Sequence, residues 1–168
     1  MIRRLGVRVI LTREGDDFVS SEHRTTIANS NRADVFLSLH VNNTLSASVS
    51  GFEVYIMDYG SLELPEGYEA LSAQSQVLDY AQAKYIDQST ALAEDIITAY
   101  QSRDGGRSSV VKRAPLFTLK GATMPAVHVE VGYSSNDRDH QLLLQEEFHQ
   151  VLIAAMTDGL AAFQKERE

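Results

Sequence analysis

A histidine and a glutamate stand near the ends of two apolar segments that have the composition of β-strands. His40 ends the segment Val35–His40, and Glu130 lies in the segment Ala126–Val131. In open α/β sheets, ligands and catalytic groups gather at the carboxyl ends of the strands. If the two strands run parallel, we expect His40 and Glu130 to share one edge of the sheet, although they are far apart in the sequence.

Side-chain alternation along the two segments supports this juxtaposition. Successive residues of a strand point to opposite faces, so Ser38 and His40 share one face of the first strand, and His128 and Glu130 share one face of the second. A buried carboxylate is costly unless it is paired or bound to a metal, so Glu130 requires a partner. One interpretation is a catalytic or metal-linked pair with His40. The other is an internal salt bridge, for which the candidate partners are Arg13, Arg107 and Arg113.

The remaining histidines and several motif classes carry less information. His128 either lines the same site as Glu130 or is a core histidine with satisfied hydrogen bonds. We expect His23 to be solvated on a polar helix, and His140 and His149 to be exposed or to cap helices. The sequence has no Ser-His-Asp arrangement at a readable spacing and no phosphate-binding loop.

The elements that position these residues alternate between strand-like and helix-like segments, which predicts an α/β fold with a mixed, mostly parallel sheet flanked by helices on both faces. Strands are expected at residues 7–12, 35–40, 51–57, 116–119 and 126–131, and helices at residues 20–33, 68–101 and in the last 25 or so residues, from apolar spacing. Ser20 or Ser21 is a plausible cap for the first of these helices.

Composition excludes several classes of function. The chain has 168 residues, of which 43% are hydrophobic and 23% are charged, as in ordinary globular domains. A net charge of −8 disfavours nucleic acid and anionic lipid as partners. There is no cysteine, which excludes disulfides, thiolate catalysis and cysteine zinc sites. No segment is long and apolar enough to span a membrane, and the basic first residues lack the apolar run of a signal peptide.

Two blocks of sequence resemble a known family. Residues 9–42, with Thr12-Arg13, Arg24 and Ala28-Asn29 ahead of Ala33–Asn42, are similar to the central block of zinc-dependent N-acetylmuramoyl-L-alanine amidases. Pro125–Asn136 is similar to their C-terminal block, and shorter matches lie between the two in the same order. The resemblance covers nearly the whole chain as one amidase-like catalytic domain, residues 1–168. Residues 58–87 have the character of a variable insertion.

The resemblance implies a mechanism and a setting. In this family a Zn²⁺ ion is held by two histidines and a glutamate, with an open position for water. By position His40 is one zinc ligand, and Glu130 is the catalytic glutamate that acts as general base and then as proton donor. The implied substrates are peptidoglycan and muropeptides, cut at the amide between N-acetylmuramic acid and L-alanine in the periplasm or extracellular cell envelope. An activator protein is a further partner to consider.

The sequence also departs from the family pattern. The family opens with a Gly-His-Gly-Gly-like turn and a glutamate ligand, and neither motif is present in this chain. The resemblance therefore implies a domain that lacks its first strand and helix, with two further zinc ligands upstream of residue 1. His128 stands where the family has an apolar residue, and a substitute ligand role is an alternative for it. Two other functions stay open: a non-catalytic relative that binds peptidoglycan or a partner protein, and a zinc-independent α/β binding protein whose Glu130 belongs to an internal ion pair.

Overall fold

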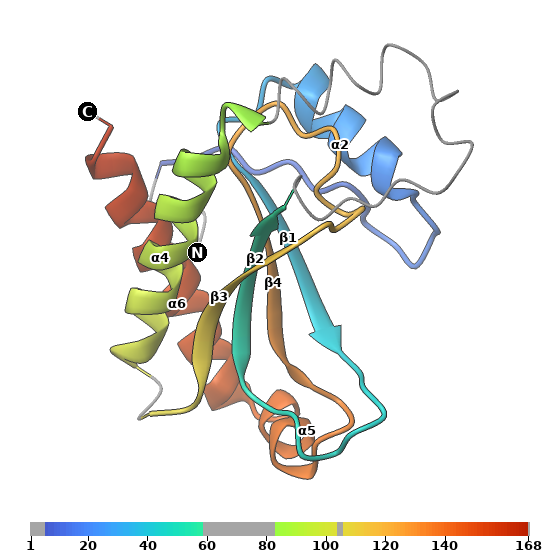
Figure 1. The fold of residues 1–168 in the computed structure, drawn as a ribbon, viewed down its shortest axis with the longest axis vertical. Helices are drawn as coiled ribbons and strands as arrows, with labels where there is room; N and C mark the ends of the chain where they lie inside the picture. The colour runs from blue at the N-terminus through green and yellow to red at the C-terminus, as the bar shows by residue number, and fades with distance from the viewer. Residues whose placement is uncertain (1–5, 59–82, 104–105, 168) are drawn as a thin grey trace.

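A computed structural model describes residues 6–58, 83–103 and 106–167 (Figure 1). Its regular elements are, in chain order, α2 (Ser21–Ser30), β1 (Phe36–Asn42), β2 (Phe52–Met57), α4 (Ile86–Gln101), β3 (Ser109–Ala114), β4 (Ala126–Tyr133), α5 (Asp137–Leu143) and α6 (Glu146–Lys165). None of the described helices is long and apolar enough to cross a membrane.

The strands form one four-stranded sheet in the order β1-β4-β2-β3. The pairs β1–β4 and β2–β3 are parallel, and the central pair β2–β4 is antiparallel. The sheet is therefore mixed and mostly parallel, as the sequence predicts. The parallel β1–β4 pair requires a long crossover between two segments that are distant in sequence.

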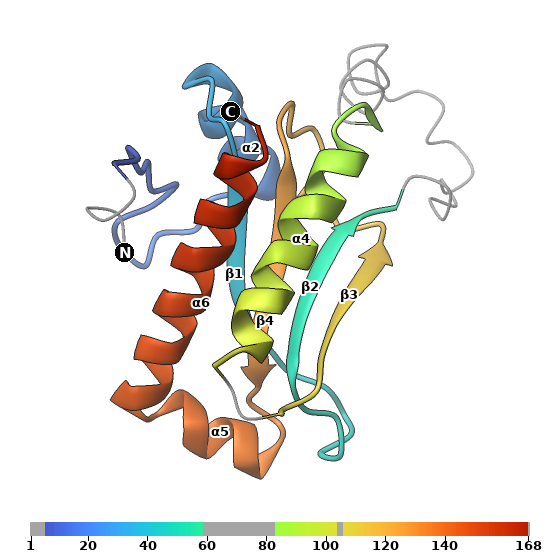
Figure 2. The same ribbon diagram turned by 90° about the vertical axis from the view of Figure 1, so that its left-hand side faces the viewer.

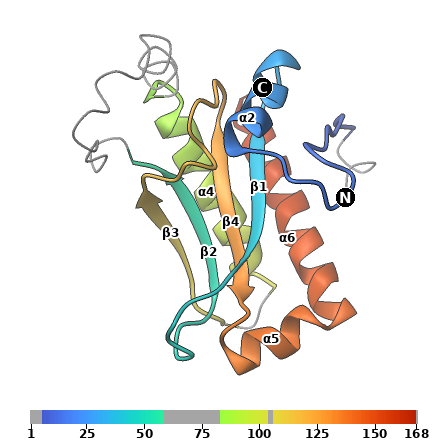
Figure 3. The ribbon, with the colours of Figure 1, turned by 90° about the vertical axis from the view of Figure 1, so that its right-hand side faces the viewer.

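Helices cover both faces of the sheet. The helices α4 and α6 lie side by side over one face, where they bury the apolar side chains of alternate strand positions (Figure 2). The helix α2 lies on the opposite side of the sheet, near the end where β1 and β4 begin (Figures 1 and 3). The main core lies between the α4–α6 layer and the sheet, and its fully buried members include Phe52, Val54, Ile56, Leu92, Ile96, Val127 and Val129.

A second, smaller apolar cluster closes one end of the face that α2 covers. It joins Ala28 of α2 to Phe36 of β1 and Ala126 of β4, together with Leu119, Ala122 and Met124. The side chain of Asn29 joins α2 to the segment between β3 and β4, since its amide donates to the Gly121 carbonyl at 2.8 Å. Beyond this cluster, the same face of the sheet carries polar side chains.

The predicted strand at residues 7–12 is wrong. These residues have irregular backbone, and the side chains of Val7, Val9, Ile10 and Leu11 are 38–64% exposed. A strand is stable only when a neighbouring strand accepts and donates its backbone hydrogen bonds. Apolar composition alone does not supply that partner.

The predicted strand at Leu116–Leu119 is also wrong, and β3 at Ser109–Ala114 takes its place. After Pro115, successive turns satisfy the backbone locally: Leu119 N–H donates to the Leu116 carbonyl at 3.0 Å, and Lys120 N–H donates to the Phe117 carbonyl at 3.2 Å. β3 is an edge strand, and its exposed Lys112 and Arg113 are the charged residues that such edges commonly carry. Because of these charges, β3 lacks the apolar run from which the other strands were predicted.

The helices follow the predictions with two changes. The first helix is α2, capped by Ser20, whose hydroxyl accepts from His23 N–H at 3.2 Å. Of the predicted helix at residues 68–101, the structure describes α4. Residues 59–82 lie outside the described part of the chain, and most of the expected insertion at 58–87 therefore does too. The C-terminal helical region is two helices, α5 and α6.

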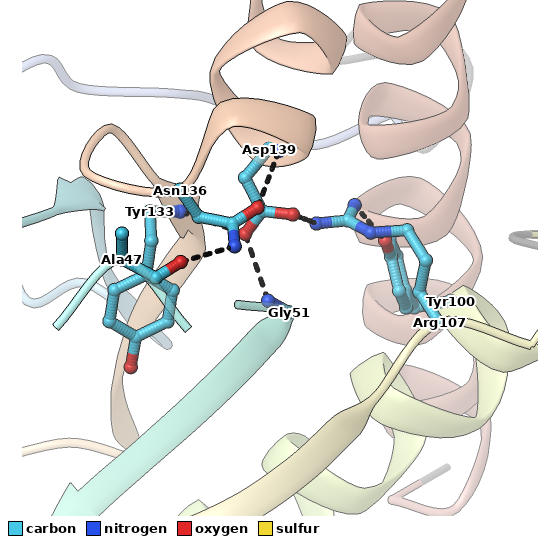
Figure 4. A network of polar contacts seen from close by, with 7 residues as sticks. All are labelled: Ala47, Gly51, Tyr100, Arg107, Tyr133, Asn136 and Asp139. Carbon is cyan, nitrogen blue, oxygen red and sulfur yellow. Dashed lines mark hydrogen bonds and ion pairs between the residues drawn. The ribbon is translucent and has the colours of Figure 1, made fainter. Parts of the chain in front are cut away.

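A buried ionic network fixes the end of β4 (Figure 4). The Asp139 carboxylate of α5 is 1% exposed and accepts hydrogen bonds from Gly51 N–H at 2.9 Å and Tyr133 N–H at 3.0 Å. Its other oxygen accepts from Arg107 at 2.7 Å, and Arg107 also donates to the Tyr100 hydroxyl at 2.7 Å. One carboxylate thus joins the start of β2, the end of β4 and the loop that follows α4.

Candidate active site

The structure brings His40 and Glu130 together. In the parallel β1–β4 ladder, His40 is paired in register with Glu130, and Ser38 is paired with His128. These four side chains lie on the face of the sheet opposite α4 and α6, because the intervening positions belong to the main core. The spatial relation that the sequence predicts is therefore present.

His128 lies between the two predicted site residues. Its ring stacks on the His40 ring, with 4.4 Å between centroids and 20° between planes. Its Nε2 is 2.8 Å from Glu130 Oε1, and its Nδ1 is 3.0 Å from Thr118 Oγ1. His128 is only 5% exposed, so it is a satisfied core histidine that also lines the site with Glu130.

The predicted salt bridge between Glu130 and an arginine is wrong for the three candidates named above. Arg107 pairs with Asp139, Arg113 donates to the Thr90 hydroxyl, and Arg13 donates to the Asp17 carbonyl. Glu130 is 8% exposed and its Oε2 is buried, with no hydrogen-bond partner among the described residues. A buried carboxylate oxygen without a donor is costly, and a catalytic role or a bound ion is one explanation for such an atom.

The His40 imidazole is half-buried, and its Nε2 is 2.9 Å from Ser38 Oγ. Burial lowers the pKa of His40 below its usual value; the neighbouring His128 lowers it further, and the Glu130 carboxylate partly opposes this shift. The lowered pKa keeps the imidazole neutral at neutral pH. A neutral imidazole is the form that binds a metal ion.

A second carboxylate, Glu53 of β2, borders the site and was missed by the sequence analysis. It is paired in register with Glu130 across the β2–β4 ladder and is 6% exposed. Its Oε2 accepts from the Tyr55 hydroxyl at 2.5 Å, and its Oε1 accepts from Lys112 Nζ at 2.6 Å. The signal that could have revealed it is the same as for Glu130: a lone carboxylate in an otherwise apolar strand, here Phe52–Met57.

The electrostatics around Glu53 keep it ionised. Burial raises its pKa, but hydrogen bonds from Lys112, Tyr55 and Tyr133 outweigh that effect, and the pKa of Glu53 lies below its usual value. Burial and the bond to Glu53 raise the pKa of Tyr55, and the same causes raise that of Tyr133 to about 12. At neutral pH Glu53 is a carboxylate and both tyrosines are neutral donors.

The described residues match a zinc site only in part. They contain no group of three His, Asp or Glu side chains arranged to hold a metal ion. They supply one neutral imidazole, His40, beside a carboxylate with an unsatisfied buried oxygen. The stacked His128 directs its nitrogens to Glu130 and Thr118, so it does not converge with His40 as a substitute ligand.

The other histidines lie away from this cluster. His23 and His140 are exposed on helices, as expected. His149 is half-buried, and its Nε2 is 2.7 Å from the Leu143 carbonyl at the end of α5. This contact agrees with the capping role that the sequence suggests for it.

Sequence comparison assigns the chain to a family. The family model described as N-acetylmuramoyl-L-alanine amidase matches residues 1–162. The chain belongs to this amidase family. The sporulation-specific N-acetylmuramoyl-L-alanine amidase of Bacillus subtilis is 32% identical over 155 residues, which are 92% of this chain and 50% of that protein.

Solved structures of this amidase family share the fold. The N-acetylmuramoyl-L-alanine amidase AmiC2 of Nostoc punctiforme has a TM-score of 0.74 and 24% identity, over 98% of this chain and 76% of that chain. The CwlD amidase of Clostridioides difficile, solved in complex with the GerS lipoprotein, has a TM-score of 0.74 and 19% identity, over 98% and 79% of the two chains. The chain spans less than two thirds of the length of the first curated relatives it matches, between 27% and 66%.

Proposed function

We propose that this chain is the catalytic part of a peptidoglycan amidase that hydrolyses the amide between N-acetylmuramic acid and L-alanine. The observation that carries the proposal is the register pairing of His40 with Glu130, together with the buried, unsatisfied Oε2 of Glu130. Membership of the amidase family supports it independently. The substrates would be peptidoglycan strands or muropeptides, encountered in the periplasm or extracellular cell envelope.

Glu130 would act as the general base and then as the general acid. Oε1 is held by His128, so Oε2 is the oxygen available to take a proton from the attacking water. The water oxygen forms a bond to the lactyl carbonyl carbon, and the carbon–nitrogen bond breaks. Glu130 returns the proton to the leaving amine, which becomes the free amino group of L-alanine.

His40 would be one ligand of a zinc ion. When bound, zinc supplies a Lewis acid that lowers the pKa of water and polarises the scissile carbonyl. His40 contributes a neutral imidazole whose orientation is set by Ser38 on one side and by the His128 ring on the other. Two further protein ligands are expected from the family resemblance and stay a prediction.

The test is muropeptide hydrolysis by the whole protein, measured as new L-alanine amino groups. Glu130→Gln keeps the shape and the Oε1 acceptor but removes the base, so we expect the rate to fall about 10²- to 10⁴-fold. Glu14→Gln is the matched control, because Glu14 is exposed in a loop, and its rate should equal that of the wild type. Full activity in Glu130→Gln would refute the proposal.

The same proteins are analysed for bound zinc. His40→Ala should lower the zinc content, whereas His140→Ala, an exposed helical histidine, should leave it unchanged. Wild-type protein that binds peptidoglycan but neither holds zinc nor releases amino groups would instead identify a non-catalytic relative of the same fold. An apo protein whose folding is unchanged in Glu130→Gln would favour the zinc-independent binding protein.

A further inference from the structure

His128 contacts both residues of the proposed reaction, His40 through its ring face and Glu130 through Nε2. It lies in the middle of β4 with 5% exposure, on the polar face of the sheet. A buried imidazole is costly unless both ring nitrogens have hydrogen-bond partners. Both nitrogens of His128 have one, and one of the two partners is Glu130.

The hydrogen-bond partners determine where the imidazole proton lies. A carboxylate oxygen accepts hydrogen bonds, so the 2.8 Å contact between Nε2 and Glu130 Oε1 fits a ring with its proton on Nε2. A threonine hydroxyl both donates and accepts, so Thr118 can donate to Nδ1 across the 3.0 Å contact. A ring with a proton on Nε2 and an acceptor at Nδ1 satisfies both contacts.

The ring of His128 is also held against rotation. His40 stacks on one face of it, and the Tyr55 ring meets it edge-on, with 6.1 Å between centroids and 82° between planes. Tyr55 is itself fixed by its hydrogen bond to Glu53. The donor that faces Glu130 is therefore set by packing on several sides, as positioning groups require.

We propose that His128 is a positioning residue for Glu130: its Nε2–H holds Oε1 and so fixes the carboxylate in one orientation beside His40, with Oε2 as the oxygen that takes the proton. This inference rests on the proposed function of Glu130 as the base. Removing the donor would leave Glu130 free to rotate about its last torsion and would double the number of unsatisfied carboxylate oxygens. The chemical step would slow, and the affinity for the substrate would be unchanged.

Two substitutions separate positioning from packing. His128→Leu fills the site with an apolar side chain and removes the donor, whereas His128→Gln places an amide N–H near the position of Nε2. In the whole protein, we expect His128→Leu to lower kcat roughly 10- to 100-fold with KM within about twofold of the wild type. His128→Gln should recover much of the loss. Equal kcat values for Leu and Gln variants that are both folded by circular dichroism would overturn the proposal.

A spectroscopic measurement tests the hydrogen bond without depending on activity. Long-range ¹H–¹⁵N correlation of the histidine side chains in this chain should find the His128 proton on Nε2, and its shift should move in Glu130→Gln. The exposed His140 should not respond. A proton on Nδ1 alone would overturn the assignment even if the protein is active. Wild-type protein without amidase activity would refute the proposed function, while the tautomer would still decide whether His128 holds Glu130.

Discussion

Two carboxylates that face each other across the β2–β4 ladder have opposite environments. Glu53 receives hydrogen bonds from a lysine and from tyrosine hydroxyls, which satisfy both of its oxygens. Glu130 receives one, from His128, and keeps a buried oxygen unsatisfied. A carboxylate whose two oxygens both accept hydrogen bonds is suited to stabilising the fold, whereas one with an oxygen that lacks a donor is suited to taking a proton. Glu53 is therefore predicted to contribute mainly to stability.

Glu53→Gln should destabilise the protein in a pH-dependent way. The folded-state pKa of Glu53 lies below its ordinary value of 4.5, so its stabilising effect is present above pH 4.5 and is lost as the pH falls through the folded pKa. We expect the variant to lose about 1–3 kcal/mol of unfolding free energy at pH 7. The difference from the wild type should shrink below pH 4.5.

Urea unfolding at pH 7 and at acidic pH measures this effect. Glu14→Gln changes the same functional group on an exposed loop and should leave the unfolding free energy nearly unchanged at either pH. A pH-independent loss in Glu53→Gln would mean that the amide group placed among the donors of Glu53, and not the lost ionisation, causes the destabilisation.

At the scale of elements, buried strands were predictable and edge strands were not. β1, β2 and β4 are dense in apolar residues because they are covered on one or both faces, and their sequence runs stand out. β3 carries Lys112 and Arg113 and pairs along one side only, so its sequence looks like a loop. Leu116 and Leu119 pack in the cluster that includes Ala28 of α2, but their backbone forms turns, and composition alone cannot distinguish such turns from a strand.

The candidate site was predictable in outline for the same reason. His40 and Glu130 interrupt apolar strands, and parallel pairing brings the ends of such strands together. The position of Glu53 beside Glu130, and the contact of Tyr55 with His128, depend on which strand neighbours β4. That neighbour is the antiparallel β2, and the order β1-β4-β2-β3 is not readable from any local pattern.

The network around Asp139 should dominate the stability of the β4–α5 junction. Asp139→Asn removes the charge that the buried Arg107 guanidinium faces, and the Arg107 side chain is only 7% exposed. We expect a loss of about 1–3 kcal/mol in the unfolding free energy, because the charge-assisted hydrogen bond between the buried guanidinium and the carboxylate is weakened. Asp137→Asn, an exposed residue of the same helix, is the control. A loss below about 1 kcal/mol in urea unfolding would contradict this assignment.

At the scale of the whole molecule, the α4–α6 layer and the polar face lie on opposite sides of the sheet. The two helices approach closely at Gly159 of α6, where an added Cβ would lie 2.7 Å from the Ile96 Cα of α4. Backbone atoms cannot move aside as the end of a flexible side chain can. The small size of Gly159 therefore sets the distance between the helices.

Gly159→Ala should lower the thermal stability even though alanine favours helix by about 1 kcal/mol over glycine. Overpacking against the α4 backbone costs about 1–3 kcal/mol, which outweighs the gain in helix propensity. Thr98→Ala, on the exposed side of α4, should change stability by less than about 0.5 kcal/mol. Because the clash lies across the sheet from the site, the His128 side-chain resonances should keep their wild-type positions below the melting temperature. A raised melting temperature in Gly159→Ala would mean that the two helices can separate freely, and displaced His128 resonances would mean that the sheet transmits the strain to the polar face.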